Sequence, residues 1–81
     1  MTQVTIYAKP GCHLCEEARA AVLQVRNKHP FALHEVDISL DPVLNRRYGE
    51  RVPVVAIDGE EAFEYWVDPG SLEDRLAKVH P

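Results

Sequence analysis

The chain has 81 residues, of which 46% are hydrophobic, and a formal net charge of −4. This length fits a single domain over residues 1–81, and the apolar fraction is ordinary for a globular protein. The net negative charge argues against a nucleic-acid partner. No apolar run approaches the roughly 20 residues that are needed to cross a bilayer. No basic, apolar leader precedes the first strand pattern, so we expect a cytoplasmic location without a membrane partner. We also expect a monomer.

The first part of the chain predicts a strand, a helix and a second strand. β-Formers alternate with other residues over positions 3–8, which predicts a half-buried strand. Apolar residues then recur at helical spacing and stop before Pro30. They are Leu14, Ala18, Ala21, Val22 and Val25. A second strand is predicted over residues 31–38.

A short helix and a buried strand follow. Asp41 is a favoured N-cap residue, and Pro42 suits the first helical position, so a helix is predicted to begin there and to end at Gly49. Residues 53–57 (P-V-V-A-I) are continuously apolar and predict a buried strand. This strand is the third along the chain.

The end of the chain predicts a hairpin and a last helix. Asp58-Gly59 favours a two-residue hairpin turn, so residues 60–65 should return antiparallel. Asp68-Pro69 is one possible start of the last helix. Ser71 and Asp74 form a competing capping box. The residues predicted for the buried face of this helix are Leu72, Leu76 and Val79.

These elements define the expected fold class. The order β-α-β-α-β-β-α predicts an α/β domain with one mixed four-stranded sheet and helices on both faces. The first two strands should be parallel and joined by a right-handed crossover.

The cysteines, Cys12 and Cys15, lie between the first strand and the first helix. A structural bridge there would close a very small loop and restrain little chain entropy, and such bridges are rare in the cytosol. Zinc needs four ligands, and the histidines are not at paired spacing. Haem attachment needs a histidine where Glu16 stands. A redox-active pair is therefore favoured over a metal site.

Two motifs carry a family resemblance that covers nearly the whole chain. Residues 9–15 (K-P-G-C-H-L-C) connect the first strand to the first helix, and Val52-Pro53 directly precedes the third strand. With the Asp-Gly hairpin beyond them, the chain resembles the thioredoxin fold in its minimal, glutaredoxin-type form. It is similar to the divergent glutaredoxin-like small proteins. The resemblance implies that the Val52–Pro53 bond is cis and faces the cysteines.

The position of the two cysteines suggests a division of labour. A helix N-terminus favours the thiolate form of Cys12. Cys15 continues the apolar face of the helix and should be more buried. We therefore expect Cys12 to attack a disulfide as the nucleophile and Cys15 to resolve the mixed disulfide.

Further residues are candidates for binding substrate or shaping the site. Lys9 adds positive charge if its side chain turns inward. His13, when protonated, could stabilise the thiolate, or it could simply be exposed. Val52 and Pro53 would shape the site and hold the substrate close.

The chain differs at two places from glutaredoxins that bind glutathione. Arg51 stands where glutathione-using glutaredoxins usually have threonine, and it could pair with a ligand carboxylate or be solvated. The turn at residues 63–68 lacks their Gly-Gly. We therefore expect glutathione to be a possible reductant but a doubtful ligand. A shared iron–sulfur cluster would need the same site. No cofactor or metal is required, because the two sulfurs carry the electrons.

We therefore expect an enzyme, a thiol–disulfide oxidoreductase acting on protein or small-molecule thiols and disulfides. The alternative is a non-catalytic redox-sensing or partner-docking module on the same fold. Tyr65 and Trp66 leave two interpretations open as well. They either form an apolar rim beside the cysteines or pack the hairpin end against the last helix.

Overall fold

The computed structural model describes residues 2–79, and its elements follow the predicted order. The strands are β1 (Gln3–Ala8), β2 (Ala32–Asp37), β3 (Val54–Ile57) and β4 (Glu60–Glu64). The helices are α1 (His13–Arg26), α2 (Pro42–Tyr48) and α3 (Pro69–Val79), and a 3₁₀ turn, η1 (Ile38–Leu40), follows β2. This turn was not predicted, and it begins where the second strand was expected to end.

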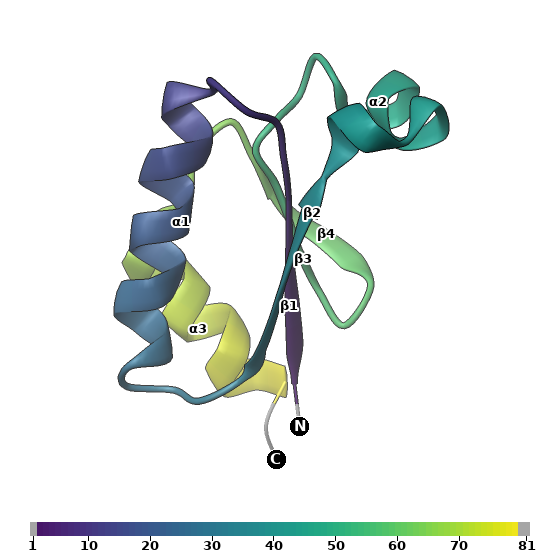
Figure 1. The fold of residues 1–81 in the computed structure, drawn as a ribbon. Coiled ribbons are helices and arrows are strands. Elements are labelled where there is room, and N and C mark those ends of the chain that lie inside the picture. The colour runs from purple at the N-terminus through teal and green to yellow at the C-terminus, as the bar shows by residue number, and fades with distance from the viewer. Residues whose placement is uncertain (1, 80–81) are drawn as a thin grey trace.

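The strands form one mixed sheet in the order β2-β1-β3-β4. β1 runs parallel to β2 and antiparallel to β3, and β3 runs antiparallel to β4. Figure 1 shows α1 and α3 together on one face of the sheet, and α2 on the other side, at the end where β1 turns into α1. The predicted fold class is therefore confirmed.

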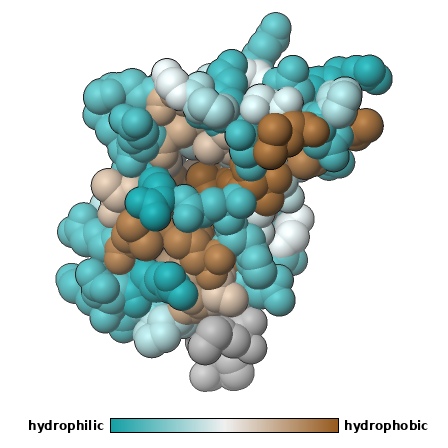
Figure 2. All heavy atoms as spheres, in the orientation of Figure 1, coloured by the Kyte–Doolittle hydropathy of each residue, from teal (hydrophilic) through white to brown (hydrophobic). Residues whose placement is uncertain are grey.

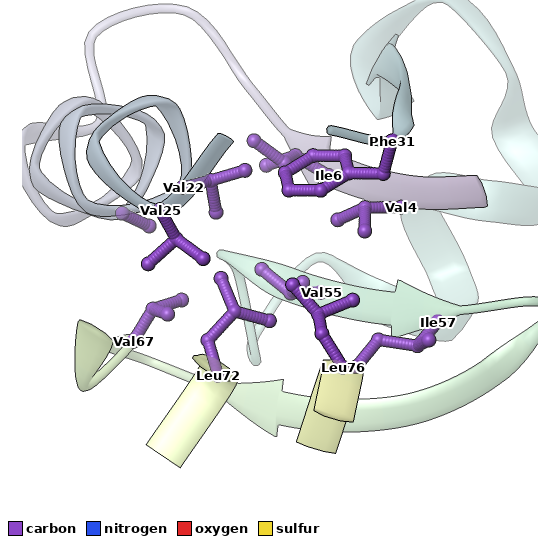
Figure 3. Close-up of a cluster of buried hydrophobic side chains, with 11 residues drawn as sticks. Val4, Ile6, Val22, Val25, Phe31, Val55, Ile57, Val67, Leu72 and Leu76 are labelled. Atoms are coloured by element: carbon purple, nitrogen blue, oxygen red, sulfur yellow. The ribbon is translucent and has the colours of Figure 1, made fainter. Parts of the chain in front are cut away.

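The main core lies between the sheet and the helices α1 and α3. Figure 3 shows its side chains pointing toward one another from β1, β3 and both helices. The buried members are Val4, Ile6, Ala18, Val22, Val25, Phe31, Val55, Ile57, Val67, Leu72 and Leu76. Burial of this apolar surface holds α1 on the sheet. The start of α1 is thereby fixed relative to the end of β1.

A second cluster lies at the end of the sheet that α2 covers. Its buried members are Cys15, Ile38, Tyr48, Val52 and Val54. The Tyr48 ring stacks on the ring of Tyr7, with centroids 4.4 Å apart and planes at 20°. Because this cluster includes one cysteine of the C-x-x-C pair, the packing of α2 and η1 also supports the pair.

One prediction for the first helix was wrong. Leu14 was placed on the buried face, but its side chain is 42% exposed. The buried stripe of α1 instead begins at Cys15 and continues through Ala18, Val22 and Val25. Neighbouring helical residues point in different directions, so a stripe through Cys15 turns Leu14 outward.

The turn and cap predictions in the middle of the chain are confirmed. Asp58 (φ 51°) and Gly59 (φ 86°) both adopt the left-handed backbone that an Asp-Gly hairpin turn requires. Asp41 caps α2, with Oδ1 accepting a hydrogen bond from the backbone N–H of Val43 at 2.9 Å.

The start of α3 decides between the two predicted caps. Asp68 Oδ2 accepts hydrogen bonds from the backbone N–H of Ser71 at 3.1 Å and from its hydroxyl at 2.8 Å. The helix therefore begins at Pro69, and the Ser71 hydroxyl binds the cap residue instead of serving as a cap itself. Leu72 and Leu76 are fully buried as predicted. The side chain of Val79 lies outside the described part of the chain.

β4 contains an irregularity that matters for the site. Its pairing with β3 shifts register between Val55 and Ala56, which leaves Ala62 as an additional residue. Side chains alternate along a regular strand, so Glu61 and Glu64 would point to opposite faces. The bulge brings both carboxylates to the same face.

Candidate functional site

The cysteine pair lies at the start of α1. Cys12 is the N-cap residue, with extended backbone (φ −93°, ψ 109°), and its Sγ accepts a hydrogen bond from the backbone N–H of Cys15 at 3.2 Å. The two sulfurs are at disulfide distance, and the Cα atoms are 5.2 Å apart. This Cα separation lies in the usual range for a disulfide. The backbone at this turn therefore holds the two cysteines where a disulfide can join them.

The local sequence explains this placement. β1 ends at Ala8, and the chain must then reverse direction within a few residues to start α1. Gly11 has φ 75°, which side chains other than glycine rarely adopt, and it provides that reversal. The helix then begins directly after Cys12.

The two cysteines differ in burial, as predicted. Cys15 is 5% exposed and belongs to the second cluster, whereas Cys12 is only half-buried at its edge. An incoming sulfur can therefore approach Cys12 from solvent, while Cys15 is screened behind it.

Lys9 and His13 make their contacts away from the sulfurs. Lys9 Nζ donates a hydrogen bond to the Gly49 carbonyl at 3.2 Å, which joins the end of β1 to the end of α2. The His13 side chain is 82% exposed, and its Nε2 lies 3.4 Å from Glu17 Oε1 one turn along the helix. Both residues lie close to the pair in the chain, but Lys9 binds Gly49 and His13 lies against Glu17.

The segment before β3 is buried beside the pair. Val52 belongs to the same cluster as Cys15, Pro53 is fully buried, and the peptide bond between them is cis. The Pro53 carbonyl accepts a hydrogen bond from the backbone N–H of Tyr65 at 2.9 Å. This bond fixes the segment to the end of β4.

Tyr65 and Trp66 remain on the surface. Trp66 is 68% exposed and Tyr65 is 41% exposed. Tyr65 also adopts a left-handed backbone, with φ 71°. Most of the Trp66 ring surface is therefore open to solvent, and both interpretations from the sequence, an apolar rim or packing of the hairpin end against the last helix, stay predictions.

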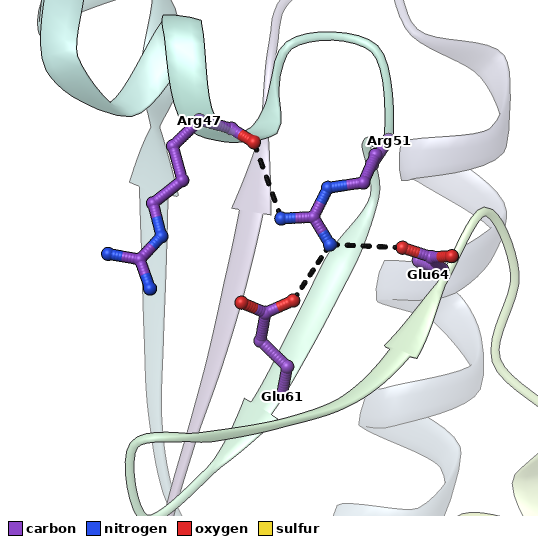
Figure 4. A network of polar contacts seen from close by, with 4 residues as sticks. All are labelled: Arg47, Arg51, Glu61 and Glu64. Atoms are coloured by element: carbon purple, nitrogen blue, oxygen red, sulfur yellow. Dashed lines mark hydrogen bonds and ion pairs between the residues drawn. The ribbon is translucent and has the colours of Figure 1, made fainter.

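Arg51 forms a cross-link between α2 and β4 (Figure 4). Its Nη1 donates to Glu61 at 2.9 Å and to Glu64 at 3.1 Å, and its Nη2 donates to the Arg47 carbonyl at 3.3 Å. The hydrogen bonds to Glu61 and then to Glu64 raise the pKa of Arg51. Its guanidinium also lies 5.3 Å from the centre of the Tyr48 ring.

This cross-link was not foreseen. The sequence left two possibilities for Arg51, a ligand carboxylate or solvent, and in the structure it binds two carboxylates of its own chain. The partners depend on the bulge in β4, and nothing in the linear sequence marks that bulge.

A cavity of about 320 Å³ opens beside the cysteines. It lies between the first part of α1 and the edge strand β2, and both cysteines contribute to its lining. Because β1 separates β2 from β3 in the sheet, this cavity is on the flank of the pair away from Val52 and Pro53. It was not predicted either, because its walls come from distant parts of the chain.

Hydrophobic surface also gathers over the 3₁₀ turn and α2. Leu40 is 82% exposed and Val43 is 67% exposed. Figure 2 shows hydrophobic atoms in this region, in the orientation of Figure 1.

Within residues 2–79, no three His, Cys, Asp or Glu side chains are grouped so that they could hold a metal ion. No helix among these residues has the length and hydrophobicity to cross a membrane.

Comparison with known proteins decides the family. Residues 3–77 match the family described as glutaredoxin-like domain (DUF836). This chain belongs to that glutaredoxin-like family. An uncharacterized protein of Mycobacterium tuberculosis is 28% identical over 82 residues, which cover 94% of this chain and 84% of the relative.

Solved structures agree with the family and the fold. A structural genomics target from X. campestris is 32% identical and has a TM-score of 0.78, with 96% of this chain and 99% of that chain covered. A protein from Nitrosomonas europaea is 30% identical at a TM-score of 0.78, with 91% and 89% covered. A Halobacterium salinarum thioredoxin is 21% identical at a TM-score of 0.74, with 99% and 75% covered, and shows the thioredoxin fold.

Proposed function

We propose that this glutaredoxin-like protein is a thiol–disulfide oxidoreductase that uses Cys12 and Cys15. The observation that carries the proposal is the unequal placement of the two sulfurs. Cys12 Sγ is at the N-terminus of α1, half-buried and bonded to the N–H of Cys15, and Cys15 is buried behind it at disulfide distance.

The reaction follows from this placement. In the reduced protein, the helix N-terminus and the backbone N–H favour a thiolate at Cys12. The thiolate attacks one sulfur of a substrate disulfide, forms a mixed disulfide and releases the other sulfur as a thiolate, which takes up a proton. Cys15, as thiolate, then attacks Cys12 Sγ and releases the second substrate sulfur. Two electrons pass from the pair to the substrate, and the internal disulfide remains.

On this proposal the substrates are disulfides of proteins or small molecules, and no bound cofactor takes part. Glutathione is a possible reductant of the internal disulfide. Lys9, His13, Val52 and Pro53 remain proposed site-shaping residues. Arg51 would act on the site indirectly, because its side chain anchors α2 and β4 and the chain enters the Val52–Pro53 segment directly after it.

The test compares the two serine variants. We expect Cys12→Ser to abolish reduction of a model disulfide, and Cys15→Ser to accumulate a mixed disulfide at Cys12 that intact mass detects after acid quench. Each variant is the matched control of the other, because each removes one sulfur from the same pair. Equal residual turnover in both variants would overturn the proposal. The non-catalytic docking module would then be the better explanation.

A redox titration of the wild-type protein provides the second readout. In buffers of glutathione and its disulfide, we expect a concerted change between dithiol and internal disulfide, read by alkylation and intact mass. Thiols that stay open to alkylation in oxidising buffer would contradict the proposal.

A further inference from the structure

We propose that the cavity between α1 and β2 binds one half of a small disulfide whose end carries a positive charge, such as the disulfide of an aminothiol. This inference rests on the proposed function and adds a substrate class to it. The cavity is distinct from the Val52–Pro53 flank, because its walls are the β1–α1 turn, the first part of α1 and strand β2.

The cavity leads to the reactive sulfur. Both Cys12 and Cys15 line it, and Cys12 is the more exposed of the two. A ligand seated in the cavity would therefore place its own sulfur next to Cys12. The part of the wall formed by β1 is apolar, with Ile6 and Ala8. The methylene groups of a small thiol can rest against this wall.

The volume is that of a small-molecule site. About 320 Å³ is near the lower limit of ordinary small-molecule sites. A half-disulfide of a few heavy atoms fits within it.

The charged side chains that line the cavity make it favour a cationic ligand. The lining contains three carboxylates, those of Glu16, Glu35 and Asp37, against the two cations of Lys9 and Arg19. Arg19 forms an ion pair with Glu35, so these two charges largely cancel for a ligand.

The three remaining charges leave a negative excess. The Lys9 ammonium is bound to the Gly49 carbonyl at the end of α2. Asp37 Oδ1 accepts hydrogen bonds from the N–H and hydroxyl of Ser39, and no cation is among these partners. Glu16 is exposed in the first turn of α1, close in sequence to both cysteines. An ammonium group in the cavity would balance this excess, whereas a carboxylate would add to it.

The reaction is thiol–disulfide exchange between the cysteine pair and the disulfide of an aminothiol. The Cys12 thiolate attacks the nearer sulfur of a dicationic disulfide, and the outer aminothiol leaves and takes up a proton. Cys15 then displaces the aminothiol that occupies the cavity. The pair is oxidised to the internal disulfide, and the substrate is reduced to two aminothiols.

The experiment is a single-turnover assay with pre-reduced, desalted protein. Three probe disulfides of similar size are compared: cystamine, which is cationic, hydroxyethyl disulfide, which is neutral, and dithiodipropionate, which is anionic. Each rate is divided by the rate of the same disulfide with dithiothreitol, a neutral thiol, which corrects for intrinsic reactivity. We expect cystamine to exceed the neutral probe by about 3-fold to 10-fold at low salt, and the difference to shrink as salt increases.

Two variants assign the preference to the cavity. Glu16→Gln removes a rim carboxylate, and the cystamine-to-neutral ratio should fall about 2-fold or more. A ratio between substrates cancels any change in the reactivity of Cys12 itself. Glu17→Gln is the matched control, because it removes the same charge from the next residue of α1, which is not part of the cavity lining. Its ratio should equal that of the wild type.

The outcomes separate the two proposals. A preference for cystamine no greater than that of dithiothreitol, or one that Glu16→Gln leaves unchanged, overturns the inference while exchange itself continues. An equal fall in both variants also overturns it, because the preference would then come from the general charge of the protein. If the reduced protein exchanges with none of the three probes, the proposed function fails, and the inference fails with it.

Discussion

The cap of α3 offers a quantitative test of how the chain specifies its last helix. Asp68 accepts one hydrogen bond from the backbone N–H of Ser71 and one from its hydroxyl. Its charge also lies at the positive end of the helix. Replacing Asp68 with alanine removes these contributions together. Asp68→Asn keeps an oxygen acceptor for the N–H and loses only the charge.

The magnitudes follow from these contacts. Loss of an N-cap typically lowers the free energy of unfolding by about 1 kcal/mol. The interaction of the charge with the helix dipole adds about 0.3–1 kcal/mol at an exposed position. Asp68→Ala should therefore cost about 1–2 kcal/mol, and Asp68→Asn about 0.3–1 kcal/mol. Ser71→Ala removes only the exposed hydroxyl contact and should change stability by less than about 0.5 kcal/mol.

The assay is urea unfolding of the oxidised protein, followed by circular dichroism. A domain of this size has a urea dependence of about 1 kcal/mol per molar, so Asp68→Ala should lower the midpoint by about 1–2 M. The midpoint of thermal unfolding should fall by about 4–8 °C for each kcal/mol. An unchanged midpoint in Asp68→Ala would refute the reasoning, since it would mean that the Ser71–Asp74 box can start the helix equally well.

Two further predictions concern the face of the sheet under α2. Arg51→Gln should lower the urea midpoint more than Glu61→Gln or Glu64→Gln alone, because it removes both carboxylate contacts and the bond to Arg47. Additive effects in the Arg51→Gln, Glu61→Gln double variant would contradict the cross-link. Burial, followed by the neighbouring Tyr48, raises the pKa of Tyr7 above its ordinary value of 10.0. Folding thus favours neutral Tyr7, and this stabilisation is complete below pH 10.0 and is lost as the pH rises through the raised pKa. Unfolding measured between about pH 9 and 11 should be less pH-dependent in Tyr7→Phe, and an identical pH dependence would contradict the shift.

Local signals allowed most of the fold to be predicted. Asp41-Pro42 and Asp58-Gly59 act within a few residues of themselves, through a side-chain cap and a left-handed turn, so the sequence alone was enough. The start of α3 required the structure, because two caps of similar quality compete there. Leu14 was misplaced because helical periodicity gives the spacing of apolar residues but does not show where the sheet ends.

The site was predictable to the extent that it depends on neighbours in the chain. The C-x-x-C spacing and the apolar stripe of α1 indicated the relative burial of Cys12 and Cys15. The partners of Arg51 depend on a bulge in a strand ten or more residues away. The cavity depends on α1 lying over β2, where Arg19 meets Glu35. Contacts of this kind arise from tertiary packing, and no short segment encodes them.

The direction of β1 has a practical consequence. Its first residue, Gln3, lies at one pole of the domain, and the cysteine pair follows its other end. Figure 1 shows the last turns of α3 returning to the pole where β1 begins. A linker attached beyond either end of the described chain would therefore leave from the pole opposite the sulfurs. The domain can be tethered to an electrode or a resin through either terminus with Cys12 facing the solution.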